Sequence, residues 1–417
     1  MKIAVLSGAG LLTAVGTLLS AARCACMPPS ASTQRPHAGW TFEVLGRADA
    51  LGADQWTGFF PAHWKDQRYY RTLEETFAGQ FAQHYLVLRD PHGDLRAVQP
   101  FFFVAQDLTV SLPRWLRAVL RPLRRWTQTR LMMVGCIVGE AQTGLAGASS
   151  VLPGPVAVAL ADALERYAAR ERVSLVLFKD FPAAAREGMR TLTTGGRYTR
   201  LPSLPGVRLA LDFASFDEYV QTRLGKATRK SLRRKFRETD TLAEPITLEV
   251  KTSVSEEEAT ALHALYERVA MRGDVHFEVF DRQYFLRLGQ RMPEHTRYFV
   301  WRHAGRIVAF SFCTVHGGVI YDNDIGIDET APSSLHLYHV TFRDIIRWAL
   351  AQGLRWYHSA PFNYAPKLHL RMELVPLDLY AHHRWPVVNW FLRRFAPLAA
   401  PTRQEPLLRL FPNAGQL

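Results

Sequence analysis

The spacing of apolar positions in the first half of the chain predicts a helix followed by a β-hairpin. Apolar residues recur at helical spacing over 66–77, and two strand-like apolar runs follow at 85–89 and 95–104. Pro91-His-Gly93 separates the runs, and this composition is typical of a turn. We therefore expect two paired strands after the helix.

The second half shows the same order of elements. A Ser-x-x-Glu capping box, Ser255 and Glu258, predicts the start of a helix. Turns at Gly305 and Gly317-Gly318 separate the strand-like runs that follow it. These runs are 297–302, 307–315 and 319–327. The order of elements repeats although the residues do not.

A helix and one more strand complete each copy. In the second half, a helix over 334–352 ends at Gly353 and leads into a strand at 354–358. In the first half, 156–170 and 173–179 take the same places. The chain therefore predicts a tandem α/β protein.

A strongly basic segment lies between the two copies, after a second capping box at Ser215 and Glu218. At helical spacing only Thr228, Leu232 and Phe236 share one face, so most of the remaining surface is cationic. Eight of its fifteen residues are basic: Arg223, Lys226, Arg229, Lys230, Arg233, Arg234, Lys235 and Arg237. The segment favours an anionic partner, and a solvated basic helix without a ligand is the alternative.

Composition agrees with folded domains and an anionic partner. The chain has 417 residues, is 48% hydrophobic and carries a formal charge of +13, from 51 Lys and Arg against 38 Asp and Glu. This balance favours a phosphate-bearing cofactor, a nucleic acid or an anionic membrane face. Four cysteines predict neither a disulfide framework nor a metal site, because no second group of ligands has zinc-like spacing.

Three segments raise the question of a membrane. An apolar run from Ile3 to Ala22 resembles a signal peptide or an anchor, while Met27 offers another start. The stretches 112–130 and 384–411 combine arginine with tryptophan and leucine, as helices in a membrane interface do. Docking of these stretches onto the protein's own core is the alternative interpretation.

Several passages in the second half, read together, carry a family resemblance. They are Arg229-Lys-Ser-Leu-Arg-Arg234, Gly305-Arg-Ile-Val-Ala-Phe-Ser311, Tyr321-Asp-Asn-Asp-Ile-Gly326, Leu337-Tyr338 with Arg347 to Leu354, and Tyr364-Ala-Pro-Lys-Leu-His-Leu-Arg371. In order and spacing this half resembles the FemAB-like, or BioF-like (CelD-type), branch of the GNAT acyltransferase superfamily. The first half looks like the degenerate partner copy of such tandem proteins.

The resemblance implies an N-acyltransferase that passes an acyl group from a thioester to an amine. A base must deprotonate the amine, and the thioester oxygen must be stabilised as it becomes anionic. The candidate bases are Asp322, Asp324, His336 and His339, and Tyr338 joins them as a candidate catalytic residue. Asp322 and Asp324 are expected to share one face of a strand, where burial raises the pKa of a carboxyl group.

The resemblance also points to residues that bind phosphate or carboxylate. Lys367 and, four residues later, Arg371 match basic positions of the family, and Arg229 and Arg233 belong to the basic segment. The glycine-rich turn that normally holds the pyrophosphate of coenzyme A is absent. Thr330-Ala-Pro-Ser-Ser-Leu335 stands in its place, so Ser333 and Ser334 at a helix start are the candidate phosphate ligands.

These inferences predict an α/β (α+β) fold of two GNAT-like units, each a mixed, mostly antiparallel sheet flanked by helices. The predicted division is a leader and linker at 1–39, a degenerate unit at 40–205 with an insertion at 112–130, basic helices at 206–245, a catalytic unit at 246–384 and a basic amphipathic tail at 385–417.

The predicted activity is N-acylation of an amine on a lipid, such as a sphingoid base, or on a cell-envelope precursor. The predicted donor is acyl-CoA or an acyl carrier protein thioester, and no metal is predicted. The protein is predicted to be cytoplasmic, at or near the inner membrane. One alternative is a FemAB-like aminoacyl transferase that acts on a peptidoglycan precursor and uses aminoacyl-tRNA as donor. If the protein is an enzyme, this is the one interpretation in which it binds a nucleic acid. The other is a non-catalytic basic module that binds a membrane or a nucleic acid.

Overall fold

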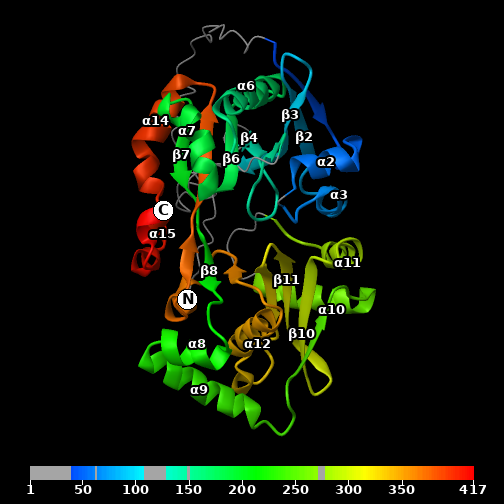
Figure 1. Cartoon of the computed structure of the whole chain (residues 1–417), viewed down its shortest axis with the longest axis vertical. Helices are drawn as coiled ribbons and strands as arrows, with labels where there is room; N and C mark the ends of the chain where they lie inside the picture. Colours follow the sequence, from blue (N-terminus) through cyan, green and yellow to red (C-terminus); the bar gives the residue numbers. More distant parts are fainter. Residues whose placement is uncertain (1–38, 62, 108–127, 148–150, 271–277) are drawn as a thin grey trace.

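The computed structural model of the chain describes residues 39–61, 63–107, 128–147, 151–270 and 278–417. The predicted leader and most of the predicted insertion at 112–130 lie outside these residues. Two twisted sheets, one above the other in Figure 1, form the body of the protein, and helices cover them. The predicted fold of two mixed sheets flanked by helices is confirmed.

The first sheet is antiparallel except for one parallel pair, β4 with β6. Its order is β1-β2-β3-β4-β6-β15-β7, and the short β5 pairs with β3. The strands are β1 (Thr41–Leu45), β2 (Gln83–Arg89), β3 (Leu95–Asp107), β4 (Gln128–Val134), β5 (Gly144–Leu145), β6 (Leu175–Pro182), β7 (Thr199–Pro202) and β15 (Leu377–His383).

The second sheet follows the same plan. Its order is β9-β10-β11-β12-β13-β8-β14, and its one parallel pair is β12 with β13. The strands are β8 (Gly206–Ala210), β9 (Thr247–Lys251), β10 (Thr296–His303), β11 (Arg306–His316), β12 (Val319–Ile327), β13 (Trp356–Ser359) and β14 (Glu373–Val375). The two predicted β-hairpins are β2–β3 and β10–β11, and both are present.

Each sheet takes one strand from the other half of the chain. Strand β8 follows the first unit but pairs between β13 and β14, whereas β15 follows the second unit but pairs between β6 and β7. The sheets are therefore not separate along the chain: β15 lies within the range 246–384 predicted for the second unit, yet it belongs to the first sheet.

Helices begin where the capping chemistry predicts. The Ser255 hydroxyl accepts from the Glu258 backbone N–H (3.1 Å), and the Glu258 carboxylate accepts from the Ser255 backbone N–H (3.2 Å). Ser215 caps α8 (Phe216–Arg223), the helix just before the basic helix: its hydroxyl accepts from the Glu218 backbone N–H (3.1 Å), and the Glu218 carboxylate accepts from the Ala214 N–H (2.9 Å).

The α-helices are α2 (Ala53–Phe59), α3 (Gln67–Thr76), α6 (Gly154–Arg170), α7 (Arg186–Thr194), α8 (Phe216–Arg223), α9 (Lys226–Asp240), α10 (Glu256–Ala270), α11 (Arg282–Arg291), α12 (Leu337–Ala351), α13 (Tyr364–His369), α14 (Pro386–Phe395) and α15 (Pro401–Gln404). Single 3-10 turns are η1 (Ala48–Ala50), η3 (Ala183–Ala185), η4 (Ser333–Leu335), η5 (Ala396–Ala399), η6 (Pro406–Leu410) and η7 (Ala414–Gln416). The predicted basic helix is α9.

One apolar core runs across the junction of the two units. Phe77, just after α3, packs edge-on against Phe280 and Tyr284 beside and within α11, with ring centroids 5.6 and 6.1 Å apart. Around these rings, Arg291 of α11 pairs with Glu75 of α3 at 2.8 Å. Burial of this aromatic surface holds the two sheets in one body.

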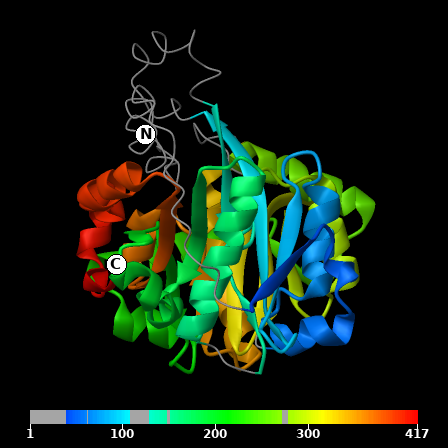
Figure 2. The ribbon, with the colours of Figure 1, turned by 90° about the horizontal axis from the view of Figure 1, so that it is seen from above.

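The C-terminal tail packs along the first sheet. Figure 2 shows its helices on one outer side of the molecule, opposite α2 and α3. Val388 and Leu392 of α14 are buried against the core, and so are Leu408 and Phe411 further on. Among the described residues, no helix is long and apolar enough to cross a membrane.

The exchanged strand predicts that the first unit does not fold alone. A fragment of residues 39–205 lacks β15, which separates β6 from β7, so we expect no cooperative unfolding transition in urea by circular dichroism. A second fragment supplies the control: residues 39–203 joined by a short turn to 377–417. The Ser203 N–H donates to the Leu377 carbonyl at 2.8 Å, so a short turn can span the join. A cooperative transition in the first fragment would contradict the prediction.

Candidate active site

The central parallel strands of the second sheet separate part of the way along their length. β12 and β13 pair from Val319 with Trp356 to Asp322 with Ser359. β13 then ends, whereas β12 continues to Ile327 and keeps its pairing with β11. Beyond Asp322, the backbone of β12 is therefore no longer paired with β13. Asn323 is the first residue past the last pair, and Asp322 and Asp324 flank it.

A β-bulge at Asn323 turns the two aspartates to opposite faces of the sheet. Asp322 pairs with Cys313 of β11 and Asp324 pairs with Phe312. Because directly paired side chains share a face and adjacent residues on a strand do not, Asp322 faces α12 and Asp324 faces α10 and α11. The expectation that they share one face was wrong, since the inserted residue breaks the alternation on which it rested.

Asp322 lies in a buried hydrogen-bond network on the α12 side. Its carboxylate accepts from the Ser311 hydroxyl and from the Tyr357 hydroxyl (2.6 Å), and the Cys313 thiol lies 3.7 Å away. Burial raises the pKa of Asp322, while the bonds from Ser311 and Tyr357 act in the opposite direction. The network fixes this carboxyl group in place.

Lys367 lies inside the protein, within electrostatic reach of Asp322. Its side chain is 7% exposed, and its ammonium donates to the Ala360 carbonyl at 2.5 Å. Burial lowers the pKa of Lys367 to about 8, although the Asp322 charge partly opposes this. The sequence predicts a residue that recognises phosphate or carboxylate, but the structure places it under the strand opening. Arg371, predicted beside it, is exposed on the surface.

Asp324 is the titratable group that the strand opening presents toward the junction of the two units. Burial raises its pKa to about 8, and the negative charges of Glu278 and Asp322 add to the effect. Its field also raises the pKa of Tyr266 and Tyr284, whose larger cause is burial. A carboxyl group that titrates near neutral pH suits general base catalysis.

The first unit brings two further charged residues toward this side. Lys179 and Asp180 lie on β6 and form an ion pair at 2.7 Å. Burial raises the pKa of Glu278, Lys179 lowers it and Asp180 raises it, so the charges of both units interact here. Sequence reasoning missed all three. Lys179 and Asp180 end an apolar strand that corresponds to β13, so an alignment of the two copies could have identified them. No feature of the sequence marks Glu278.

The corresponding strand opening in the first sheet is filled by the chain itself. β4 and β6 pair as far as Val134 with Phe178, and the segment around Ala141 then packs between them. The Ala141 N–H donates to the Asp180 carbonyl at 3.0 Å, and a Cβ on Gly135 would lie 2.4 Å from the Ala141 Cβ. The opening in the second sheet is thus the one that carries the predicted site residues Asp322 and Asp324.

The N-terminal end of α12 holds the other predicted catalytic residues. His339 contacts the ammonium of Lys235 on α9, and burial together with that charge lowers its pKa to about 4. Such an imidazole is a poor base at neutral pH. The Tyr338 hydroxyl has a pKa above its usual range because of burial and the nearby Asp322 charge, so it keeps its proton. His336, before the helix, bonds to Glu238 at 2.6 Å.

The predicted phosphate ligands lie in two places. Ser333 and Ser334 are exposed in η4, next to the C-terminal half of α9, where the Thr239 hydroxyl donates to the Leu335 carbonyl at 3.5 Å. Arg229 and Arg233 instead reach back to Gln221 of α8, each at 2.5 Å. Lys235 is the basic residue of α9 that the structure brings to the start of α12.

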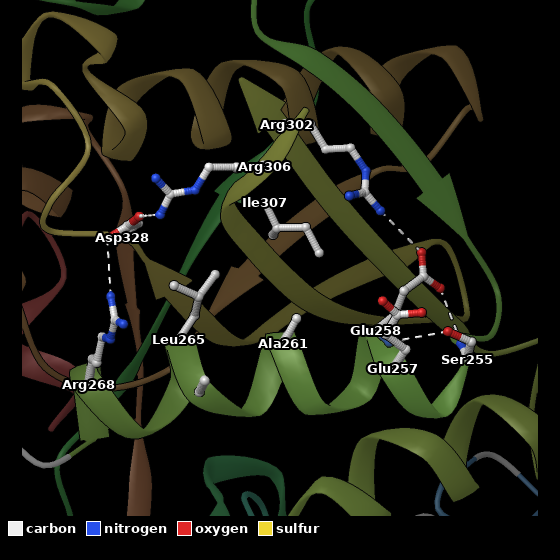
Figure 3. A pocket seen from close by; sticks show the side chains of 11 residues that line it. Ser255, Glu257, Glu258, Ala261, Leu265, Arg268, Arg302, Arg306, Ile307 and Asp328 are labelled. Atoms are coloured by element: carbon white, nitrogen blue, oxygen red, sulfur yellow. Dashed lines mark hydrogen bonds and ion pairs between the residues drawn. The ribbon is translucent and has the colours of Figure 1, made fainter. Parts of the chain in front are cut away.

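An open pocket of about 650 Å³ runs beside α10, one strand away from the opening (Figure 3). Asp328 at its rim pairs with Arg268 (3.1 Å) and Arg306 (3.8 Å). Its walls are Ser255, Glu257, Glu258, Ala261, Ala264, Leu265, Arg268, Arg302, Arg306, Ile307 and Asp328. None of the residues predicted for the site lines this pocket.

No group of three or more His, Cys, Asp or Glu among the described residues could hold a metal ion.

Comparison with solved structures finds proteins of similar architecture. L-PGS from Bacillus licheniformis is 16% identical over 78% of this chain and 95% of its own, with a TM-score of 0.47. FemX is 11% identical, with coverages of 81% and 96% and a TM-score of 0.49. A tandem GNAT protein from the clavulanic acid biosynthesis pathway is 12% identical, with coverages of 83% and 99% and a TM-score of 0.45. Nothing about the substrate follows from these likenesses.

No curated protein sequence matches the chain. A family model does: residues 226–365 match the model described as an acetyltransferase (GNAT) domain. The match begins at α9, includes the separated strands β12 and β13 with Asp322 and Asp324, and ends two residues before Lys367. Residues 226–365 therefore form an acetyltransferase domain of the GNAT type.

Proposed function

We propose that this protein forms an amide by moving an acyl group from a thioester to a primary amine, at the opening between β12 and β13. The observation that carries the proposal is Asp324. It lies just past the last paired residues of the two strands, and its pKa is raised to about 8. The ionised form of such a group accepts a proton from an ammonium group far more readily than a carboxylate with the usual pKa of 3.8 does.

In the proposed reaction, Asp324 removes a proton from the ammonium group of the acceptor, and the neutral nitrogen attacks the thioester carbonyl. A C–N bond forms and the carbonyl oxygen becomes anionic. Collapse of this intermediate breaks the C–S bond, and the second proton lost by the nitrogen passes to the leaving thiolate. Tyr338 holds a proton that it can donate to the oxyanion or the thiolate, and the N–H groups of β12 beyond Asp322 are further candidate donors.

Asp322 and Lys367 serve as positioning residues in this proposal. The Asp322 carboxylate joins β11 to β13 through Ser311 and Tyr357, and Lys367 fixes the Ala360 carbonyl just after β13 ends. Both residues therefore fix the strand ends at the proposed point of chemistry. They act on the reaction through the backbone and through their charges, not as exposed ligands.

The donor is proposed to carry phosphate, as acyl-CoA and the phosphopantetheine arm of an acyl carrier protein do. Ser333 and Ser334 precede the N-terminus of α12, where backbone N–H groups and the helix dipole favour an anion. Lys235 of α9 contacts His339 in the first turn of α12, so a positive charge lies at the same helix end. The exposed basic surface of α9 also suits a larger anionic donor, so aminoacyl-tRNA is the second candidate.

The acceptor is proposed to be an amine on a lipid or on a cell-envelope precursor, and the protein to work at the cytoplasmic side of the inner membrane. Asp180 and Glu278 lie near the opening, and Asp324 adds negative charge there when it ionises; such charge favours binding of an ammonium group. An apolar acyl or sphingoid chain would have to extend away from these carboxylates.

The test is transfer by the purified full-length chain. Acetyl-CoA, long-chain acyl-CoA, acyl carrier protein thioesters and aminoacyl-tRNA are each offered with sphingoid bases and amino-bearing envelope precursors, and amides are detected by mass spectrometry. We expect amide formation from a thioester that carries phosphopantetheine. Product from aminoacyl-tRNA alone would favour the second candidate, and no product from any donor, together with unchanged amide lipids in cells that lack the protein, would overturn the proposal.

A further inference from the structure

The outer face of the C-terminal helix α14 is apolar and basic. Val387 and Trp390 are 59% and 54% exposed, and Leu398, in the turn that follows, is 54% exposed. Val387, Trp390 and Arg394 are spaced three and four residues apart, so they lie on one side of the helix. In Figure 1 this helix lies along the outer edge of the first sheet.

Packing within the protein does not explain these exposed side chains. The opposite side of α14 buries Val388 and Leu392 against the core. Asn389 fixes the helix to the end of β15, because it accepts from the His383 N–H (2.7 Å) and donates to the His383 carbonyl (2.6 Å). A helix docked in this way is expected to carry polar residues on its outer side, and this one carries tryptophan and valine.

The charged side chains of α14 and the residues around it are all positive. From Arg384 to Gln404 the sequence contains four arginines and no aspartate or glutamate. Arg384, Arg394 and Arg403 are exposed, and Arg393 reaches the Gly196 carbonyl. Two copies of this face would repel each other, so the charge disfavours a dimer through α14. An anionic surface would be attracted.

We propose that the outer face of α14, with Val387, Trp390, Arg394 and Leu398, docks onto an anionic phospholipid bilayer. The indole of Trp390 suits headgroup depth, Val387 and Leu398 enter the acyl boundary, and the arginines pair with lipid phosphates. The segment neither spans the bilayer nor needs to unfold. This inference deepens the proposed function by giving the acyltransferase a membrane side, and its test measures binding alone, so the two can fail separately.

The experiment is sedimentation of the full-length chain with vesicles of phosphatidylcholine alone or with phosphatidylglycerol at a ratio of about seven to three. We expect binding to the anionic vesicles that weakens as salt rises, because exposed charges are screened. The double variant Val387→Asp/Trp390→Asp should bind at least about tenfold more weakly, since it loses apolar contact and adds charge that the lipid repels.

Leu410→Asp is the matched control, because Leu410 is an exposed apolar residue (64%) in η6, outside the proposed docking face. It should bind as the unaltered protein does, and all three proteins should unfold at the same urea concentration. The inference is overturned if the unaltered chain ignores anionic vesicles, if the double variant binds them equally well, or if light scattering shows a dimer that the double variant abolishes.

Discussion

Replacing Asp324 with asparagine is expected to lower kcat for amide formation by about 10²- to 10⁴-fold, the range for loss of a general base. Asparagine has nearly the same shape but cannot accept a proton. The rate of the unaltered enzyme should rise from pH 6 toward pH 8 as Asp324 ionises, because the pKa of Asp324 is raised to about 8. The variant should lose this dependence. Single-turnover rates from pH 6 to pH 9 measure both effects.

The same substitution is expected to stabilise the protein at high pH. The folded-state pKa of Asp324 lies above the usual 3.8, so this residue's contribution to stability is complete below about pH 4 and is lost as pH rises toward about 8. The loss approaches about 1.4 kcal/mol per pH unit over that window. The stability of Asp324→Asn should not decrease in this way. Urea unfolding at several pH values should therefore show that the variant is more stable than the unaltered protein at pH 8.

Asp328→Asn is the control for both effects, since Asp328 lies four residues further on, outside the opening. Burial alone would raise the pKa of Asp328, but bonds from Thr330 and the charges of Arg268 and Arg306 lower it. This variant should therefore lose stability above about pH 4 and keep most of its kcat. Full activity of Asp324→Asn, or a loss of stability at pH 8, would remove Asp324 from the role of base.

The order of elements could be predicted because it depends on local pattern. The capping boxes at Ser215 and Ser255 and the turns at Gly305 and Gly317-Gly318 each act within a few residues, and all four recur in the structure. The exchange of β8 and β15 could not be predicted in the same way. Each is a short apolar run that would suit either sheet, and its partner is decided by packing across the whole chain.

The site was harder to predict because it depends on departures from regular pattern. Strict alternation places Asp322 and Asp324 on one face, and only the register shift against Phe312 and Cys313 separates them. Lys367 belongs to a residue type that is almost always exposed, so its burial depends on the carboxylate and carbonyl that the fold brings to it.

Replacing Lys367 with methionine is expected to reduce both turnover and stability. Methionine fills similar space but leaves the Ala360 carbonyl without its donor and Asp322 without the nearby positive charge. Leaving a buried carbonyl without a donor typically costs about 1–3 kcal/mol. Methionine also removes the desolvation of the Lys367 cation, which is the main cause of the lowered pKa of Lys367 and offsets part of this cost. We therefore expect a net loss of no more than about 1–3 kcal/mol in urea unfolding at pH 7, with kcat at least about 10²-fold lower because the strand ends are no longer fixed.

A second variant separates the structural effect from the effect on the reaction. Asp322→Asn/Lys367→Met contains neither buried charge, so it should recover the part of the stability that Lys367→Met loses through the Asp322 carboxylate left without its nearby cation. It should not recover turnover if Lys367 positions the strand ends. The pH profile gives an independent reading: the Lys367 cation is lost as pH rises through about 8, so the rate of the unaltered enzyme should fall on the alkaline side, whereas both variants should lack that fall. A double variant with restored stability and full kcat would show that Lys367 serves the fold alone.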